Sequence, residues 1–360
     1  KKADFVAMGR PFLADPEFPR KAQEGRSKEI RPCTACNQGC YDAAFSLSPV
    51  TCLLNPRTAR KREMVIAEAP KKEKILVIGG GPAGMEVARE MALRGHRVSL
   101  FEKGERLGGL MWLASRCPGR EEFAAALDYY IHQLSILGVE VCLEREATSE
   151  TVRESGFPNV IIATGGNLIV PPIPGISRPQ VITIADLLSG KKPAIGRIII
   201  LGGGKLGVES AIFAAEQASM EDSVALFLMN EGALSPKESM NLICTGNDVT
   251  IITQRKKLGK DIGMSTRGVR LKALKKSAIK TVQEAHWKEI VDEGVLLERN
   301  GKTEVIKADT IVLAIGSESN RALYEELEGK VLGLHLIGDA KTPRNMLAAI
   351  YDAFETARRI

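Results

Sequence analysis

The sequence predicts an α/β protein with two parallel-sheet domains, one inserted in the other. A strand-like run, a glycine cluster and a helical pattern follow one another at residues 75–94, and the same order recurs at residues 198–216. This repeat is typical of two Rossmann-like βαβ units. A cysteine-rich segment at residues 31–70 precedes both units, and residues 1–30 contain a βα unit of their own.

The bulk composition is that of a globular protein with two or three domains. Of the 360 residues, 44% are hydrophobic and 26% are charged. The net charge is +6, but the basic residues are mixed with acids and form no stripe with interleaved aromatics, so nucleic acid is not a predicted partner. No apolar run reaches the ~18 residues of a membrane span, so a membrane is not a predicted partner either.

The cysteines favour a reducing compartment, for which the cytoplasm is the expected choice. The chain has seven cysteines, an odd number, and four of them crowd into residues 33–52. Such a distribution argues against a disulfide framework and indicates a metal site.

Residues 1–30 are interpreted as the end of a larger domain. An apolar run at Phe5–Met8 predicts a short strand, which ends at Gly9 and Arg10 and continues into a polar helix. One βα unit cannot fold alone. A glycine and an arginine at a strand end could hold a phosphate, as in the late strands of a (β/α)₈ barrel, and a surface arginine is the alternative.

The cysteine-rich segment predicts a [4Fe–4S] cluster. Cys33, Cys36 and Cys40 are closely spaced, and Cys52 follows after eleven residues. A cubane cluster needs four converging thiolates, which three near cysteines and one remote cysteine can supply. The alternative is a structural zinc site, whose usual second C-x₂-C arm is missing here. The isolated cysteines are interpreted as buried free thiols: Cys117, Cys142 and Cys244.

The first glycine motif predicts a dinucleotide site. Gly79 permits a tight turn, Gly81 lets the backbone approach a pyrophosphate, and Gly84 lets helix and strand pack closely. The helix that starts here offers its positive end to the phosphates. Glu102 ends the next strand, where a carboxylate accepts hydrogen bonds from an adenosine ribose.

The second glycine motif repeats these roles with Gly202, Gly204 and Gly207. The acid after its second strand is absent, and the strand runs instead into Arg255 and Lys256. Cations here suit the 2′-phosphate of NADPH, which an acid would repel. We therefore expect NADP(H) in preference to NAD(H), with a solvated basic turn as the alternative.

The rest of the chain completes these two domains. Residues 219–247 are longer than a normal connection and are interpreted as a surface insertion. Residues 311–316 and 334–339 are interpreted as strands that return to the first domain, and residues 348–359 as its closing helix. The expected boundaries are 71–190 with 310–360 for the first domain and 191–309 for the second.

Three further glycine turns point to FAD at the first motif. They lie at Arg106–Gly109, Ala163–Gly166 and Gly338–Ala340, and their order resembles the two-dinucleotide-domain flavoprotein reductases. The resemblance implies that Asp339 binds the ribityl or pyrophosphate part and that the Gly338 turn passes near the isoalloxazine. The expected FAD contacts in these turns are Gly109, Thr164, Gly165, Gly338 and Asp339.

The whole chain resembles the iron–sulfur NADH:flavin oxidoreductase family, and most nearly its bacterial NADPH-dependent 2,4-dienoyl-CoA reductases. Besides the glycine motifs, the matching stretches are Ala3–Asp15, Cys33–Pro56, the insertion segment Gly232–Pro236 and Gln254–Lys260. The resemblance implies that residues 1–30 close an Old Yellow Enzyme-type barrel, where Gly9 and Arg10 hold the phosphate of FMN. Catalytic residues would lie upstream, so none is assigned here.

The resemblance implies electron flow from NAD(P)H to FAD, then to [4Fe–4S] and to FMN, for reduction of an enoyl or dienoyl substrate. Hydride transfer needs near-contact, so two flavins in separate domains require a one-electron relay. One alternative is an amine dehydrogenase-like protein with reverse electron flow, against which the intact second glycine motif argues. The other is a non-catalytic module that binds ADP.

Overall fold

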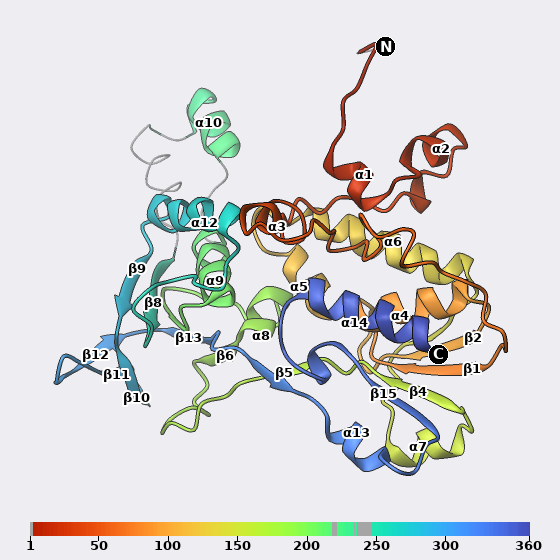
Figure 1. The fold of residues 1–360 in the computed structure, drawn as a ribbon. Helices are drawn as coiled ribbons and strands as arrows, with labels where there is room; N and C mark the ends of the chain where they lie inside the picture. The colour runs from red at the N-terminus through yellow and green to blue at the C-terminus, as the bar shows by residue number, and fades with distance from the viewer. Residues whose placement is uncertain (1–2, 218–221, 234, 236–246) are drawn as a thin grey trace. The chain divides into compact units, whose positions relative to one another are not determined.

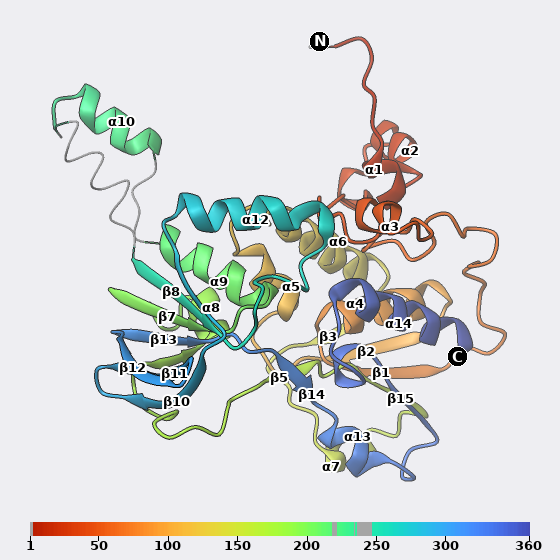
Figure 2. The same ribbon diagram turned by 60° about the vertical axis from the view of Figure 1, so that its left-hand side comes forward.

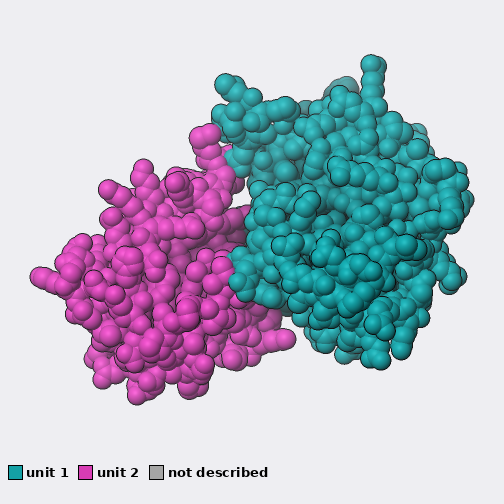
Figure 3. Space-filling view, turned by 60° about the horizontal axis from the view of Figure 1, so that its bottom comes forward, with its two compact units in different colours: residues 1–167, 317–360 teal, residues 168–316 magenta. Residues whose placement is uncertain are grey.

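The computed structural model describes residues 3–217, 222–233, 235 and 247–360. The chain forms two compact units, residues 1–167 with 317–360 and residues 168–316 (Figure 3). The second unit is therefore inserted in the first. Two short strands that pair with each other carry the chain between the units, β5 (Gly166–Leu168) and β14 (Ser317–Ser319).

The first unit is built on a parallel five-stranded sheet in the order β15-β4-β1-β2-β3 (Figure 1). Ile75 and Val77 of β1 face one core, and Leu76 and Ile78 face another, so the central strand is buried on both sides. This explains its continuous apolar run. The strands are β1 (Lys74–Ile78), β2 (Arg97–Phe101), β3 (Glu140–Cys142), β4 (Asn159–Ile162) and β15 (Gly333–Leu336).

Helices cover both faces of this sheet (Figures 1 and 2). On one face α4 packs against α14 and α6, and residues of α7 and α13 join the core on the other. Asn345 starts α14 because its side chain accepts a hydrogen bond from the Ala348 amide at 2.9 Å. The helices are α4 (Pro82–Leu93), α5 (Leu110–Ser115), α6 (Glu122–Ile136), α7 (Ser149–Glu154), α13 (Ala322–Leu327), η2 (Gly338–Ala340) and α14 (Met346–Arg359).

Buried charges on α4 make the stability of this unit depend on pH. Arg89 forms ion pairs with Glu86 and Glu90, and all three side chains are at most 5% exposed. Burial raises the pKa of Glu90 to about 7 from 4.5, although Arg89 opposes the shift. The folded state thus keeps a proton that the unfolded chain releases. The free energy of unfolding should therefore fall between about pH 4.5 and pH 7 and level off above.

We expect the substitution Glu90→Gln to flatten this fall, because the amide does not ionise. Urea denaturation at a series of pH values measures the effect. The control is Glu325→Gln, which removes an exposed carboxylate of α13 and should leave the pH profile unchanged. An equally steep fall in Glu90→Gln would contradict the assignment.

The cysteine-rich segment and the residues before it form short helices within the first unit. The predicted strand at Phe5–Met8 is wrong: these residues are not in a sheet, and Phe5 and Val6 are 94% and 75% exposed. A strand with no neighbour has nothing to pair its backbone groups. The helices are α1 (Arg10–Ala14), α2 (Phe18–Gln23), η1 (Ser27–Glu29) and α3 (Tyr41–Phe45).

The second unit repeats the architecture with a parallel sheet in the order β6-β13-β7-β8-β9. An antiparallel sheet, β10-β11-β12, adjoins it through a shared core. The strands are β6 (Val181–Thr183), β7 (Arg197–Leu201), β8 (Asp248–Thr253), β9 (Lys280–Gln283), β10 (His286–Val291), β11 (Gly294–Arg299), β12 (Lys302–Lys307) and β13 (Thr310–Leu313). The helices are α8 (Ile184–Ser189), α9 (Lys205–Glu216), α10 (Asp222–Asn230) and α12 (Met264–Lys276).

One predicted strand belongs to the other unit. The run at 311–316 was expected to return to the first domain, but β13 pairs with β7 and β6, with Ile311 opposite Ile199. It takes the place beside β7 that β4 takes beside β1. The units accordingly divide at 167/168 and 316/317, not at 190/191 and 309/310. The run at 334–339 does return, as β15.

About half of the predicted insertion at 219–247 lies outside the described residues, as does Cys244. Its described part contains α10. Within the described residues, none of the helices combines the length and the apolar character that crossing a membrane requires.

Candidate functional site

The first glycine loop brings strand and helix into close contact. Gly79 has φ +107°, and a Cβ there would lie 2.4 Å from the carbonyl oxygen of Ala163. A Cβ on Gly84 would lie 1.8 Å from the carbonyl oxygen of Gly79. At Gly81, the N-cap of α4, a Cβ would have no described atom within 4 Å. The loop is thus closed toward the sheet and open at the helix start, which suits a bound pyrophosphate.

Glu102 is held against this loop. One carboxylate oxygen accepts a hydrogen bond from the Gly80 amide at 2.7 Å, and the other accepts one from the Gly104 amide at 2.7 Å. Each oxygen keeps a further lone pair that a ribose hydroxyl could use. The position predicted for a ribose-binding acid is therefore occupied by a carboxylate in fixed orientation.

The turn that contains Gly109 lies on the open side of the loop. The Gly108 amide donates to the Gly80 carbonyl at 2.9 Å. Gly109 has φ +48°, and its Cβ would come within 3.2 Å of the Gly81 Cα. A side chain at residue 109 would therefore crowd the backbone that a ligand has to approach.

The turns after β4 and β15 reach the same edge of the sheet, because the strands are parallel. Thr164 donates through Oγ1 to the Asn320 carbonyl at 2.7 Å, and the Gly165 carbonyl accepts from the Asn320 amide at 3.2 Å. Gly338 has φ +63° and packs against Ala83 of α4. Asp339 follows it and accepts from the Arg344 amide at 3.1 Å. The turns that contain these predicted FAD contacts thus lie at one edge of the sheet, and the backbone of Asn320, which no sequence pattern marks, is bonded to the first of them.

The second glycine loop has the same geometry. A Cβ on Gly202 would lie 2.3 Å from the Ala314 carbonyl oxygen, and one on Gly207 would lie 1.9 Å from the Gly202 carbonyl oxygen. The Gly259 amide donates to the Gly203 carbonyl at 2.8 Å, as Gly108 does at the first loop. The internal repeat seen in the sequence is therefore a repeat in three dimensions.

Two charged side chains lie at the start of α9. The Lys205 amide donates to both carboxylate oxygens of Asp261, at 2.9 and 3.0 Å. Arg255 lies with Nη1 3.7 Å from an oxygen of Asp261, and both side chains are about half exposed. Lys256 is exposed. The two cations were predicted, whereas no sequence pattern marks Asp261, which follows Arg255 by six residues in an irregular turn.

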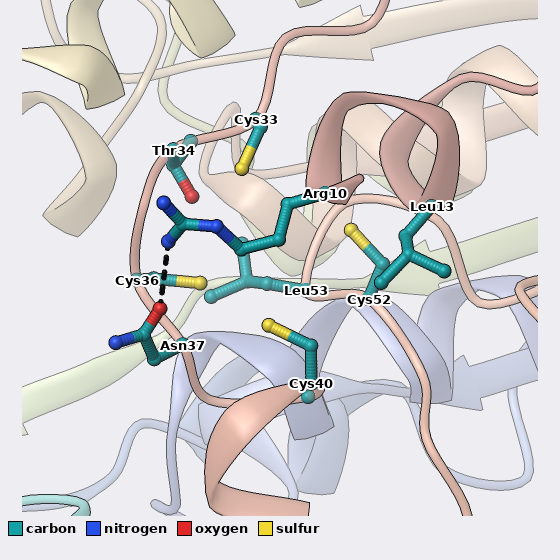
Figure 4. Close-up of a pocket in the computed structure, with 10 residues that line it drawn as sticks. Arg10, Leu13, Cys33, Thr34, Cys36, Asn37, Cys40, Cys52 and Leu53 are labelled. Carbon is teal, nitrogen blue, oxygen red and sulfur yellow. Dashed lines mark hydrogen bonds between the residues drawn. The ribbon is translucent and has the colours of Figure 1, made fainter. Parts of the chain in front are cut away.

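The four clustered cysteines line one cavity of the first unit. Figure 4 shows their sulfur atoms turned toward a common space. The Thr51 amide donates to the Gly39 carbonyl at 2.6 Å, and this bond holds Cys52 beside Cys40. Leu53 and Leu54, which follow Cys52, are 1% exposed in the core and anchor the remote cysteine.

Burial favours the protonated form of two thiols in this cavity. Burial raises the pKa of Cys52 to about 11, and burial likewise raises the pKa of Cys40. Metal binding needs the thiolate, so loading the site would release protons. All six described cysteines are free. Among the described residues, no group of three or more His, Cys, Asp or Glu side chains is placed to hold a single metal ion.

Arg10 extends into the cysteine cavity. Its Nη1 donates to Oδ1 of Asn37 at 2.8 Å (Figure 4). Its guanidinium lies 5.6 Å from the centre of the Tyr41 ring. Gly9 precedes it as the N-cap of α1. That Gly9 and Arg10 hold the phosphate of FMN stays a prediction.

Comparison with known proteins gives consistent matches. The family model described as pyridine nucleotide-disulphide oxidoreductase matches residues 73–340. A metal reductase of Desulforamulus reducens is 42% identical over 361 residues, which cover 99% of this chain and 54% of the relative. Cinnamate reductase of Clostridium sporogenes is 32% identical over 362 residues, which cover 100% of this chain and 50% of the relative.

A solved structure has the same fold over nearly the whole chain. The complex of 2-naphthoyl-CoA reductase with 2-naphthoyl-CoA superposes with a TM-score of 0.87 at 31% identity. The match covers 98% of this chain and 50% of that one. The chain thus spans about half the length of the relatives that it matches.

Proposed function

Because the chain belongs to the pyridine nucleotide-disulphide oxidoreductase family, we propose that it is the electron-input part of a flavin- and iron–sulfur-dependent NAD(P)H oxidoreductase. The family membership confirms the predicted resemblance to flavin-linked reductases, and FAD and a nicotinamide dinucleotide fit this family. The observation that carries the proposal is the pair of glycine loops with one backbone geometry and different side chains beside them. Glu102 adjoins the first loop, whereas Arg255, paired with Asp261, adjoins the second.

Each group of residues has a defined task in this proposal. The open start of α4 at Gly81 holds the pyrophosphate of FAD, and Glu102 accepts hydrogen bonds from its ribose. The start of α9 and Arg255 hold the nicotinamide nucleotide. The four cysteines of the cavity hold the cluster, which their number and sulfur chemistry fit. When bound, FAD supplies two-electron exchange with the nicotinamide, and the cluster supplies one-electron transfer.

We place the reduced substrate in the half of the full-length protein that this chain does not span, at FMN. Its class is proposed to be an unsaturated acid or thioester. Two relatives support this by name, a cinnamate reductase, named for an unsaturated acid, and a 2-naphthoyl-CoA reductase, named for an aromatic thioester. The chain by itself is expected to reduce artificial electron acceptors.

An anaerobic titration of the cluster-reconstituted protein with NADPH and with NADH tests the proposal. We expect the flavin absorbance to bleach, at lower concentrations of NADPH than of NADH. A flavin band that neither nucleotide bleaches would point to the reverse electron flow of an amine dehydrogenase. Protein that contains ADP and no flavin would point to a non-catalytic module.

The substitution Arg255→Ala should weaken binding of NADPH about tenfold and that of NADH by less than about twofold. A charge-assisted hydrogen bond to the 2′-phosphate contributes on the order of 1.5 kcal/mol, and NADH lacks that phosphate. Fluorescence titration with each nucleotide measures both dissociation constants.

The matched control is Arg197→Ala, because Arg197 is also about half exposed and paired with an aspartate, Asp309. It stands at the amino end of β7, at the opposite edge of the sheet from the loop. Equal losses for NADPH and NADH in Arg255→Ala would contradict a 2′-phosphate role.

A further inference from the structure

The start of α9 already holds an anion from the chain itself. Both carboxylate oxygens of Asp261 accept hydrogen bonds from the Lys205 amide, the first amide of the helix. A Cβ on Gly204, the N-cap, would lie 3.0 Å from one of these oxygens. The carboxylate therefore stands at the backbone that a nucleotide phosphate is expected to approach.

The first loop shows what this position looks like without such a carboxylate. The equivalent N-cap there is Gly81, whose added Cβ would have no described atom within 4 Å. Glu102, the acid near that loop, binds the Gly80 amide one residue earlier and leaves the start of α4 open. The two loops agree in backbone geometry, so Asp261 is a specific difference between them.

Asp261 also engages the cation assigned to the nucleotide. Arg255 Nη1 lies 3.7 Å from Asp261 Oδ1, and the same guanidinium nitrogen would lie 3.6 Å from a Cβ on Gly204. Arg255 thus reaches over the start of the helix with Asp261 as its partner. Both side chains are about half exposed, so either can rotate into solvent.

We propose that Asp261 is a displaceable anionic cap of the second glycine loop. Without nucleotide it satisfies the helix start and holds Arg255 in place. When a dinucleotide binds, its pyrophosphate takes over the Lys205 amide, the 2′-phosphate of NADP(H) takes over Arg255, and the Asp261 carboxylate turns out to solvent. This inference rests on the proposed binding of a nicotinamide dinucleotide at this loop.

The cap sets the affinity of the loop for nucleotides. A carboxylate at a helix start is stabilised by the helix dipole, so displacing it costs free energy. Its charge also repels the entering phosphate. Replacing it with a neutral side chain of the same shape should therefore tighten binding, whereas removing an acid that merely supported the fold would not.

Isothermal titration of the flavin-loaded protein with NADP⁺ and NAD⁺ tests the cap, since the oxidised nucleotides bind without turnover. We expect Asp261→Asn to lower the dissociation constant of NADP⁺ about fivefold, which corresponds to ~1 kcal/mol. Asp261→Ala should act in the same direction. Thermal denaturation checks that both variants are folded.

The matched control is Asp248→Asn. Asp248 is 48% exposed against 52% for Asp261, and it too is paired with a cation, Lys280, but at the amino end of β8. Its substitution should leave the dissociation constant within about twofold of the parent. Both substitutions remove one negative charge, so a difference between them must come from where that charge lies and not from the change in net charge.

The outcomes distinguish the cap from the proposed function. If the parent binds NADP⁺ and Asp261→Asn binds it equally or more weakly, the cap is refuted and the nucleotide site stands. If neither protein binds either nucleotide, the nucleotide site itself is refuted, and the cap with it. If Asp261→Asn binds NADP⁺ and the parent does not, the cap is supported, because the carboxylate then blocks nucleotide binding in the parent.

Discussion

The Gly84→Ala variant is expected to lose bound FAD and to unfold at a markedly lower temperature. The new Cβ would lie 1.8 Å from the Gly79 carbonyl oxygen, a backbone atom that cannot move aside as a flexible side chain could. Helix α4 would have to move away from β1, which opens the loop proposed to hold the pyrophosphate. Overpacking of this kind costs roughly 3 kcal/mol. The flavin-to-protein ratio after desalting and a thermal melt measure the two effects.

Two further alanine variants serve for comparison, one as a control and one as a test of the second loop. Gly268→Ala is the control, because Gly268 lies in helix α12 with no described atom within 4 Å of an added Cβ. It should leave the protein unchanged or slightly more stable. Gly207→Ala repeats the clash at the second loop and should abolish nucleotide binding while FAD stays bound. Full retention of FAD by Gly84→Ala would contradict the close packing described here.

The Cys52→Ser variant is expected to lose most of its iron and the visible absorption of the cluster, with FAD retained. Cys52 lines the cavity together with the three closely spaced cysteines and would be the fourth ligand. A hydroxyl is a poor ligand for a cubane that requires four thiolates. Chemical assay of iron and sulfide after anaerobic reconstitution measures the loss, which should go from about four irons per chain to less than one.

The control for this variant is Cys142→Ser, because Cys142 lies in β3 and does not line the cavity. It should reconstitute like the parent. Iron content that is equal in Cys52→Ser and the parent would argue against the four-cysteine site. Zinc in place of iron in the parent would favour the structural alternative. In either case the bleaching of FAD by NADPH reports separately on the nucleotide sites.

The glycine motifs and the cysteine spacing could be predicted from the sequence because their information is local. Gly79, Gly84, Gly202 and Gly207 each serve a turn between a strand and the helix that follows it, so a few adjacent residues specify them. The apolar runs that begin at residues 75 and 198 likewise predicted the starts of β1 and β7 to within one residue. Burial on both faces of a parallel sheet leaves a continuous apolar run that is visible without any partner.

Other predictions failed or fell short because they depend on contacts between distant residues. The strand at 310–313 is apolar enough for either sheet, and its pairing with β7 decides the unit to which it belongs. The run at Phe5–Met8 has the composition of a strand, but a strand forms only beside another.

The sequence by itself determined that this chain has two dinucleotide-binding folds with a four-cysteine segment before them. The tertiary structure decided what stands around each loop: Asn320 beside Thr164, Arg10 among the cysteines and Asp261 at the start of α9. A strand–turn–helix unit is specified by neighbours along the chain, whereas these residues meet their partners through the packing of the whole unit. Residues that meet in this way carry no pattern that their own surroundings in the sequence could reveal.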